Sequence, residues 1–281
     1  MADFAPVEFG HCRELVMLPG SLFEFTSRYV PADQLEALLA LYALKQAIST
    51  IPYSAVDDSV KWAKLKWWSE EVVAEPGSSS RHPVLRALWL SGAREKLGSA
   101  LLLRLISDAI QQIDVVPESN KEAMFERFSE LGATDIELEL ALDAAEIDAQ
   151  SLGFLGAATS LFRTVSSFSA NNESEATGLP LDILAKYNVS AAELEQKPYP
   201  QTLEEIIAEL AGTAMDWYSR GMTGLKLSSE AGGCEHLHLR WAMENRRLSA
   251  ILKDPSGFLE VDKRFGPSDA WFAWRFLRQL K

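Results

Sequence analysis

Cysteine is scarce in this chain of 281 residues, which contains only Cys12 and Cys234. Two cysteines cannot form a disulfide framework, so a reducing compartment is favoured. Long hydrophobic runs are also missing, since charges interrupt each apolar stretch before the about 20 residues that a membrane-spanning helix needs. Residues 1–15 hold acids and a proline where a signal peptide would be apolar. We therefore expect a cytoplasmic protein, with at most a peripheral contact to the inner face of a membrane.

Positive charge is in short supply as well. The chain has 27 Lys and Arg against 40 Asp and Glu, which gives a formal net charge of −13. Binding to a nucleic-acid backbone requires a positive field around the protein. The balance of charge therefore excludes nucleic acid as the expected partner.

Helical periodicity is abundant. Apolar residues recur at steps of three and four in roughly eight or nine segments, and strand-like alternation is absent. We expect helices over residues 31–51 and 57–75, and one long helical stretch over 120–165 with a kink near Gly132. No internal repeat or long linker interrupts the chain. The pattern predicts an all-α protein with a single domain over residues 1–281.

Several landmarks follow one another in order along the chain. The segment "LYALKQAI" is followed by "KLKWWSEEV" and "RHPVL", and later by "LGAATSLFRTV", "GLPLDIL" and "AKYNV". This ordered set resembles the squalene/phytoene synthase family from about residue 20 to residue 255. The resemblance implies an isoprenoid-synthase-like barrel of helices around a central cavity, in which two prenyl diphosphates are joined head to head.

The resemblance also implies a magnesium site. Two diphosphates bring several negative charges into one cavity, and Mg²⁺ held by carboxylates neutralises them and assists their departure. The family supplies these carboxylates from two aspartate-rich helix segments, where steps of three or four residues keep them on one face. The first segment should follow Tyr42 in "LYAL", and the second should follow Arg163.

Both segments have lost their acids in this chain. The positions that match the metal ligands are all uncharged: Ser49, Thr50, Tyr53, Thr164 and Phe168. Gln46 stands where the resemblance leads us to expect a basic residue, whereas Arg163 is retained. Hydroxyl groups carry no charge to offset the cost of dehydrating Mg²⁺.

These substitutions predict a protein with no catalytic residue, no metal and no cofactor. We expect it to bind an isoprenoid lipid or a protein partner, and Tyr42, Gln46 and Arg163 are the candidate residues of its cavity. The pattern is similar to the non-catalytic branch related to the mitochondrial complex I assembly factor, which implies a role in assembling a membrane complex. Two alternatives stay open: an active prenyltransferase that uses Mg²⁺ through relocated ligands, and a helical domain without any ligand.

Relocated ligands would have to come from other acids. Asp57 and Asp58 suit either a displaced metal motif or the start of a helix, and the helix start is the expected role. A second set lies at steps of four, four and three: Asp135, Glu139, Asp143 and Glu146. On one helix face these four could bind a divalent ion if they pointed inward. We expect them to form a solvated outer face.

Three further clusters invite a functional interpretation. Cys234, Glu235, His236 and His238 are zinc ligand types, but His236 and His238 would point ~200° apart on a helix, so no zinc site is expected. For Trp62, Trp67 and Trp68, core packing is the expected role, with at least one ring near the surface or a cavity rim.

The third cluster is a basic aromatic C-terminal segment at about residues 262–281. Its basic residues are Lys263, Arg264, Arg275, Arg278 and Lys281. Aromatic and leucine side chains alternate with them. Such a segment can lie in a membrane interface or dock on its own domain, and both interpretations stay open.

Overall fold

The computed structural model describes residues 7–74, 80, 82–113, 116–169, 179–194, 199–223, 225, 227–228, 234–260 and 265–280. In chain order the helices of the first half are α1 (Val7–Val16), α2 (Leu22–Ser27), α3 (Ala32–Ser49), α4 (Asp58–Val73), α5 (Pro83–Leu90), α6 (Ala93–Ile110) and α7 (Lys121–Leu142). The second half contains α8 (Ala149–Ser167), α9 (Leu181–Tyr187), α10 (Ala191–Leu194), α11 (Leu203–Met222), α12 (Glu235–Lys253), α13 (Pro255–Glu260) and α14 (Pro267–Leu280). Two-residue strands β1 (Glu146–Ile147) and β2 (Leu227–Ser228) pair antiparallel. The predicted all-α fold is confirmed.

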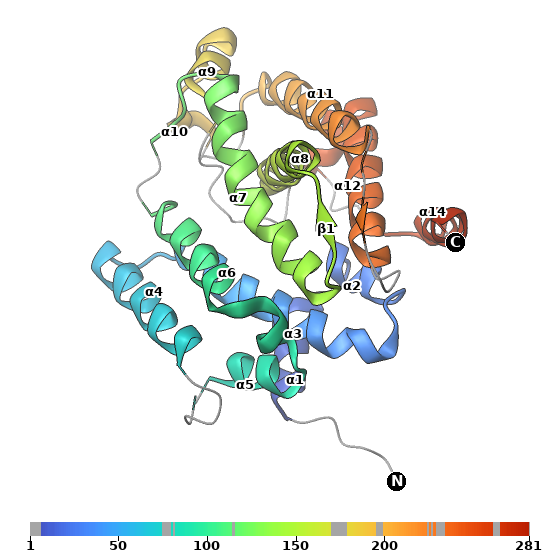
Figure 1. The fold of residues 1–281 in the computed structure, drawn as a ribbon. Helices are drawn as coiled ribbons and strands as arrows, with labels where there is room; N and C mark the ends of the chain where they lie inside the picture. The colour runs from blue at the N-terminus through green and yellow to red at the C-terminus, as the bar shows by residue number, and fades with distance from the viewer. Residues whose placement is uncertain are drawn as a thin grey trace.

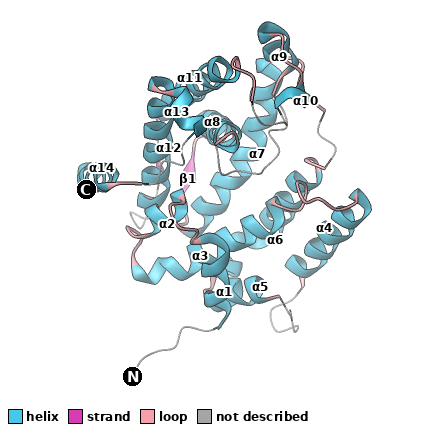
Figure 2. Cartoon of the chain, turned by 180° about the vertical axis from the view of Figure 1, so that it is seen from behind, coloured by secondary structure: helices cyan, strands magenta, loops and turns pink. Residues whose placement is uncertain are grey.

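The helices pack around α7, which runs diagonally through the middle of the molecule (Figure 1). One apolar core joins α1, α3, α4, α5 and α6, and a second joins α8, α9, α11 and the end of α12. Since α7 contributes residues to both cores, it is surrounded by protein on more than one side. The view from behind shows the same arrangement, with α14 at the outer edge of the molecule (Figure 2).

The expected single helix over residues 120–165 is in fact two helices. α7 ends at Leu142, and Ala144 adopts a left-handed conformation with φ 48°. α8 then starts after Asp148, whose carboxylate accepts a hydrogen bond from the Ser151 backbone N–H at 2.9 Å. The prediction of one continuous stretch was wrong, because this N-cap and β1 break the periodic pattern without a glycine or a proline.

Gly132 does not kink α7, which runs through it without a break. Its role is a close helix crossing. A Cβ atom placed on Gly132 would lie 2.0 Å from the backbone oxygen of Gly156 in α8, and one placed on Gly156 would lie 2.7 Å from the Ala133 nitrogen. Backbone cannot move aside as a flexible side chain can, so both glycines are required for this contact. The close crossing fixes the register between α7 and α8, and therefore the site described below.

None of the helices in the described part of the chain combines the length and the apolar character that a bilayer span requires.

Candidate functional site

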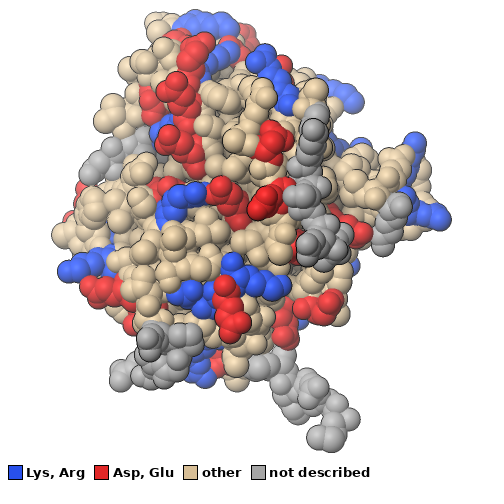
Figure 3. Space-filling model, in the orientation of Figure 1, with Lys and Arg blue, Asp and Glu red and all other residues tan. Residues whose placement is uncertain are grey.

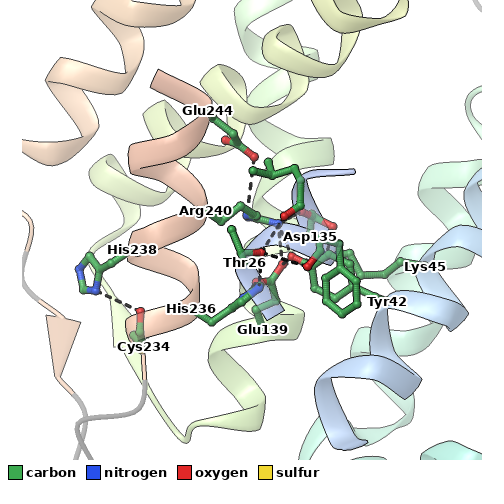
Figure 4. A network of polar contacts seen from close by, with 12 residues as sticks. Thr26, Tyr42, Lys45, Asp135, Glu139, Cys234, His236, His238, Arg240 and Glu244 are labelled. Carbon is green, nitrogen blue, oxygen red and sulfur yellow. Dashed lines mark hydrogen bonds and ion pairs between the residues drawn. The ribbon is translucent and has the colours of Figure 1, made fainter. Parts of the chain in front are cut away.

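Two carboxylates one turn apart on α7 form the centre of the candidate site. Asp135 and Glu139 are each only 4% exposed, although both are acids. Lys45 from α3 and Arg240 from α12 reach them from two sides (Figure 4). The Lys45 Nζ atom lies 2.9 Å from Glu139 Oε1, and Arg240 Nη1 donates to Asp135 Oδ2 at 2.9 Å. Lys45 also pairs with Asp135, and Arg240 with Glu139. Two acids and two bases thus form a closed ring of ion pairs.

Tyr42 and His236 extend this ring toward α2. The Tyr42 hydroxyl donates to Glu139 Oε1 at 2.9 Å and accepts from Arg240 at 3.2 Å. His236 Nδ1 lies 3.4 Å from Glu139 Oε2, and its Nε2 lies 3.0 Å from the Thr26 hydroxyl. Burial lowers the pKa of His236, although Glu139 works against this effect, so the imidazole is neutral near pH 7. His236 therefore adds a polar contact, rather than a third positive charge, to the ring.

Opposite charges control the ionisation of the two central acids. Burial by itself raises the pKa of Asp135, but the charges of Arg163, Lys45 and Arg240 outweigh it and hold that pKa far below its usual value. Burial likewise raises the pKa of Glu139, and Arg240 and Lys45 reverse the effect. Both groups are therefore ionised at neutral pH. Glu244, farther along α12, is the exception, because burial raises its pKa in spite of Arg240.

Arg163 from α8 joins the network from its accessible side. Its Nη2 atom donates to Asp135 Oδ2 at 2.6 Å, yet 54% of the Arg163 side chain is exposed. The buried ring is thus open to solvent at this guanidinium. Lys45, Arg163 and Arg240 face Asp135 and Glu139, and Glu244 lies 3.7 Å from Arg240 on α12, so three cations stand beside three acids of the protein.

The acidic face expected from the sequence is therefore not a solvated one. Asp135 and Glu139 point inward, Asp143 is half-buried with a pKa raised to about 6 by burial, and Glu146 is exposed in β1. The prediction failed because α7 is enclosed on several sides, so a face that carries acids can still be an inner face. The cations that Asp135 and Glu139 need come from other helices.

The positions predicted to match the family's aspartates lie in three different environments. Ser49 and Thr50 are exposed at the end of α3, and the Thr50 hydroxyl donates to the Gln46 backbone oxygen of its own helix at 2.9 Å. Thr164 in α8 donates in the same way to the Ser160 oxygen at 3.2 Å. Phe168 is fully buried in the apolar core.

Tyr53 lies close to a second charged region. Its hydroxyl donates to Gln112, and the charges of Arg127 and Arg163 counteract the rise in its pKa that burial causes. A pocket of about 320 Å³ lies beside Gln112, and its lining includes Arg127 and Glu118, which pair at 3.0 Å, together with apolar side chains such as Val116 and Leu131. Through Gln112, Tyr53 therefore borders a pocket whose two charged groups pair with each other.

These residues do not fit a magnesium site. The threonine hydroxyls already donate within their helices, Phe168 offers no donor atom, and the two suitable carboxylates are occupied by Lys45, Arg163 and Arg240. A divalent ion would have to displace these cations from the carboxylates that they pair with. Among the described residues, no group of three or more His, Cys, Asp or Glu side chains is arranged to hold a metal.

The other clusters singled out from the sequence are separate from the network. Asp57 is the residue that precedes α4 but makes no capping hydrogen bond, and Asp58 pairs with Lys61 at 3.0 Å. Trp68 is buried, whereas Trp62 and Trp67 are exposed, so core packing explains one ring of three.

The two histidines of the cysteine–histidine cluster make contacts in different places. His236 joins the ring, while His238 Nδ1 lies 3.1 Å from the Cys234 backbone oxygen. Of the C-terminal basic residues, Lys263, Arg264 and Lys281 lie outside the described residues.

Of the candidate cavity residues, Tyr42 and Arg163 meet in one network through Arg240 and Asp135, while Gln46 is exposed on α3. Lys45 and Arg240 were not predicted from the sequence as members of the site. A usable signal was present for Lys45, which directly follows Ala43 and Leu44 in an apolar stretch, three residues after Tyr42. Arg240 follows the histidines of α12 and gave no comparable signal.

Comparison with known proteins adds the wider context. The family model for squalene/phytoene synthase matches residues 19–265. Among solved structures, a dehydrosqualene synthase in complex with a ligand is similar at a TM-score of 0.69 and 14% identity, covering 98% of this chain and 95% of that one. The squalene synthase HpnC from Alicyclobacillus acidocaldarius is similar at a TM-score of 0.63 and 16% identity, covering 92% of this chain and 98% of that one. A comparison with curated protein sequences finds no significant match.

Proposed function

Because this chain belongs to the squalene/phytoene synthase family, we propose that it is a non-catalytic member that binds an isoprenoid lipid with an anionic head, without a metal ion. One observation carries the proposal: Asp135 and Glu139 are neutralised by Lys45, Arg163 and Arg240. Departure of pyrophosphate needs Mg²⁺ held by carboxylates that are free to bind it. Side chains of this protein occupy those carboxylates instead.

The anionic head follows from the exposed guanidinium of Arg163. Arg163 donates one hydrogen bond to Asp135, and half of its side chain is exposed. Its remaining N–H donors can therefore bind a phosphate or a carboxylate. Tyr53 lies near the charges of Arg127 and Arg163, and the pocket beside Arg127 has both polar and apolar side chains on its wall. An isoprenoid chain with one anionic group matches this combination of positive and apolar surface.

Turnover is the first test. The purified protein is incubated with farnesyl or geranylgeranyl diphosphate and Mg²⁺, and release of pyrophosphate is measured. We expect no release above the rate without protein. Sustained release would establish the alternative, an active prenyltransferase with relocated ligands, and end the proposal.

Binding is the second test, with farnesyl monophosphate as the probe in isothermal titration calorimetry. We expect the same affinity in Mg²⁺ and in EDTA, and about a tenfold weaker affinity for Arg163→Gln. Arg220→Gln is the matched control, since Arg220 is similarly exposed and pairs with an acid, Asp216, at 3.0 Å. Binding that requires Mg²⁺, or an equal loss in both variants, contradicts the proposed site; no binding at all favours a helical domain without a ligand.

In this proposal the lipid-bound protein assists the assembly of a membrane complex rather than making a lipid. Cells that lack the chain should then keep their products of head-to-head condensation and lose an assembled complex. A fall in those products with intact complexes would contradict this role.

A further inference from the structure

α14 carries a surface that the interior site does not use. One face of this helix packs on the body of the protein. Ala273 is fully buried against a cluster with Leu239 and Met243 of α12, and Asp269 accepts from Arg246 at 2.8 Å. Phe265, just before the helix, stacks on Phe25 of α2 with ring centroids 4.6 Å apart. These contacts fix the orientation of α14, so its opposite face is held outward.

The outward face is aromatic and basic. Trp271 and Trp274 are 59% and 51% exposed, which makes them the most exposed tryptophans among the described residues. Arg275 and Arg278 follow at helical spacing and lie over the two rings, 5.5 and 4.6 Å from their centroids. The outer face of an ordinary surface helix is polar, so two exposed indoles on one face require an explanation.

The charge of this face differs from that of the whole chain. The chain has a net charge of −13, yet the described outer face of α14 offers two arginines and no acid. In the space-filling view α14 projects from the body with basic side chains at its outer edge (Figure 3). A flat, negatively charged surface can therefore approach α14 without meeting the acidic body first.

We propose that this outer face of α14 docks on the surface of an anionic phospholipid bilayer. Tryptophan rings favour the boundary between headgroups and acyl chains, and arginines above them can bind lipid phosphates. The helix would lie parallel to the membrane. This inference rests on α14 alone and holds whether or not the interior binds a lipid.

A second protein molecule is a poorer match for this face. Two half-exposed indoles offer on the order of 250 Å² of aromatic surface. A stable protein interface buries about 800 Å² on each partner. A bilayer needs no such area, because single side chains insert into it and each arginine strengthens binding to an anionic surface about fivefold.

The experiment is vesicle flotation with the full chain. Vesicles contain equal parts phosphatidylglycerol and phosphatidylcholine, or phosphatidylcholine alone. We expect flotation with the anionic vesicles, a loss of at least tenfold in the bound fraction on neutral vesicles, and weakening at high salt.

Two double variants locate the binding face, Trp271→Ser with Trp274→Ser and Arg275→Gln with Arg278→Gln. Each should lower the bound fraction on anionic vesicles about tenfold. Trp62→Ser is the matched control, because Trp62 is 45% exposed on α4. All of these side chains are exposed, so unchanged thermal unfolding is expected and confirms that each variant folds.

Equal flotation of the parent and the tryptophan variant overturns the proposal, as does equal binding to neutral and anionic vesicles. Dimers in light scattering that disappear in either double variant, without any flotation, would assign the face to a second copy of the chain.

Discussion

Replacing Glu139 by Gln tests whether the buried ion network holds the fold together. Glu139 accepts from Tyr42 and Lys45 and pairs with Arg240, all from other helices. The variant keeps the shape and removes the negative charge that faces Lys45 and Arg240. Loss of one partner of a buried ion pair costs about 3–5 kcal/mol. In a chain of this size we expect a fall in melting temperature on the order of 10 °C.

Glu137→Gln is the matched control for this substitution. Glu137 lies on the same helix two residues earlier and pairs with Arg104, with both side chains partly exposed. Exposed pairs contribute about 0–1 kcal/mol, so this variant should unfold almost like the parent. Chemical denaturation with urea gives both free energies of unfolding. Equal destabilisation by the two substitutions would refute the role assigned to the network.

The same variant should change the dependence of stability on pH. Both central acids have native pKa values below their ordinary 3.8 and 4.5, so they stabilise the fold above those values. That stability is lost as the pH falls toward the native pKa values, because the unfolded chain then binds more protons. Below about pH 4.5, the free energy of unfolding of Glu139→Gln should therefore fall less steeply with decreasing pH than that of the parent protein. A slope identical to that of the parent would contradict the lowered pKa of Glu139.

Three further predictions concern other parts of the molecule. Gly132→Ala should lower the free energy of unfolding in urea by several kcal/mol, because its Cβ would clash with backbone atoms of α8. Gly153→Ala is the control: its Cβ would lie 3.9 Å from the nearest atom, so this variant should be neutral or stabilise by up to about 1 kcal/mol. Asp143→Asn should stabilise the protein at pH 7 by about 1 kcal/mol. Burial raises the pKa of Asp143 to about 6, so the native state loses stability as the pH rises from 3.8 through 6. No gain in the free energy of unfolding at pH 7, or an equal gain at pH 4, would contradict this prediction. The double variant Ser49→Asp with Tyr53→Asp should release no pyrophosphate from farnesyl diphosphate and Mg²⁺, and turnover would show that the segments are wrongly assigned.

Local patterns predicted the helices well and their environment poorly. Apolar spacing located α3 and α4, because this signal acts within a few residues. The inward direction of Asp135 and Glu139 depends on how α3, α8 and α12 surround α7. Spacing along one helix shows which residues share a face, but the partners that enclose that face are more than 90 residues away for Lys45 and Arg240. This pairing of residues far apart in the chain could not be predicted from a single sequence.

The network also explains why restoring acids on α3 should not restore a metal site. In a metal-dependent cavity the bound ion neutralises the carboxylates. Before the ion binds, these acids have no cationic partner. Here Lys45, Arg163 and Arg240 supply that positive charge permanently. An aspartate introduced at Tyr53 would lie near the positive charge of Arg163, and an ion pair with the protein would form before a bond to Mg²⁺. Since α8 still offers Thr164 and Phe168 on the other side, the second set of ligands would be missing as well. Metal dependence would therefore require removal of the cations together with addition of acids on both helices.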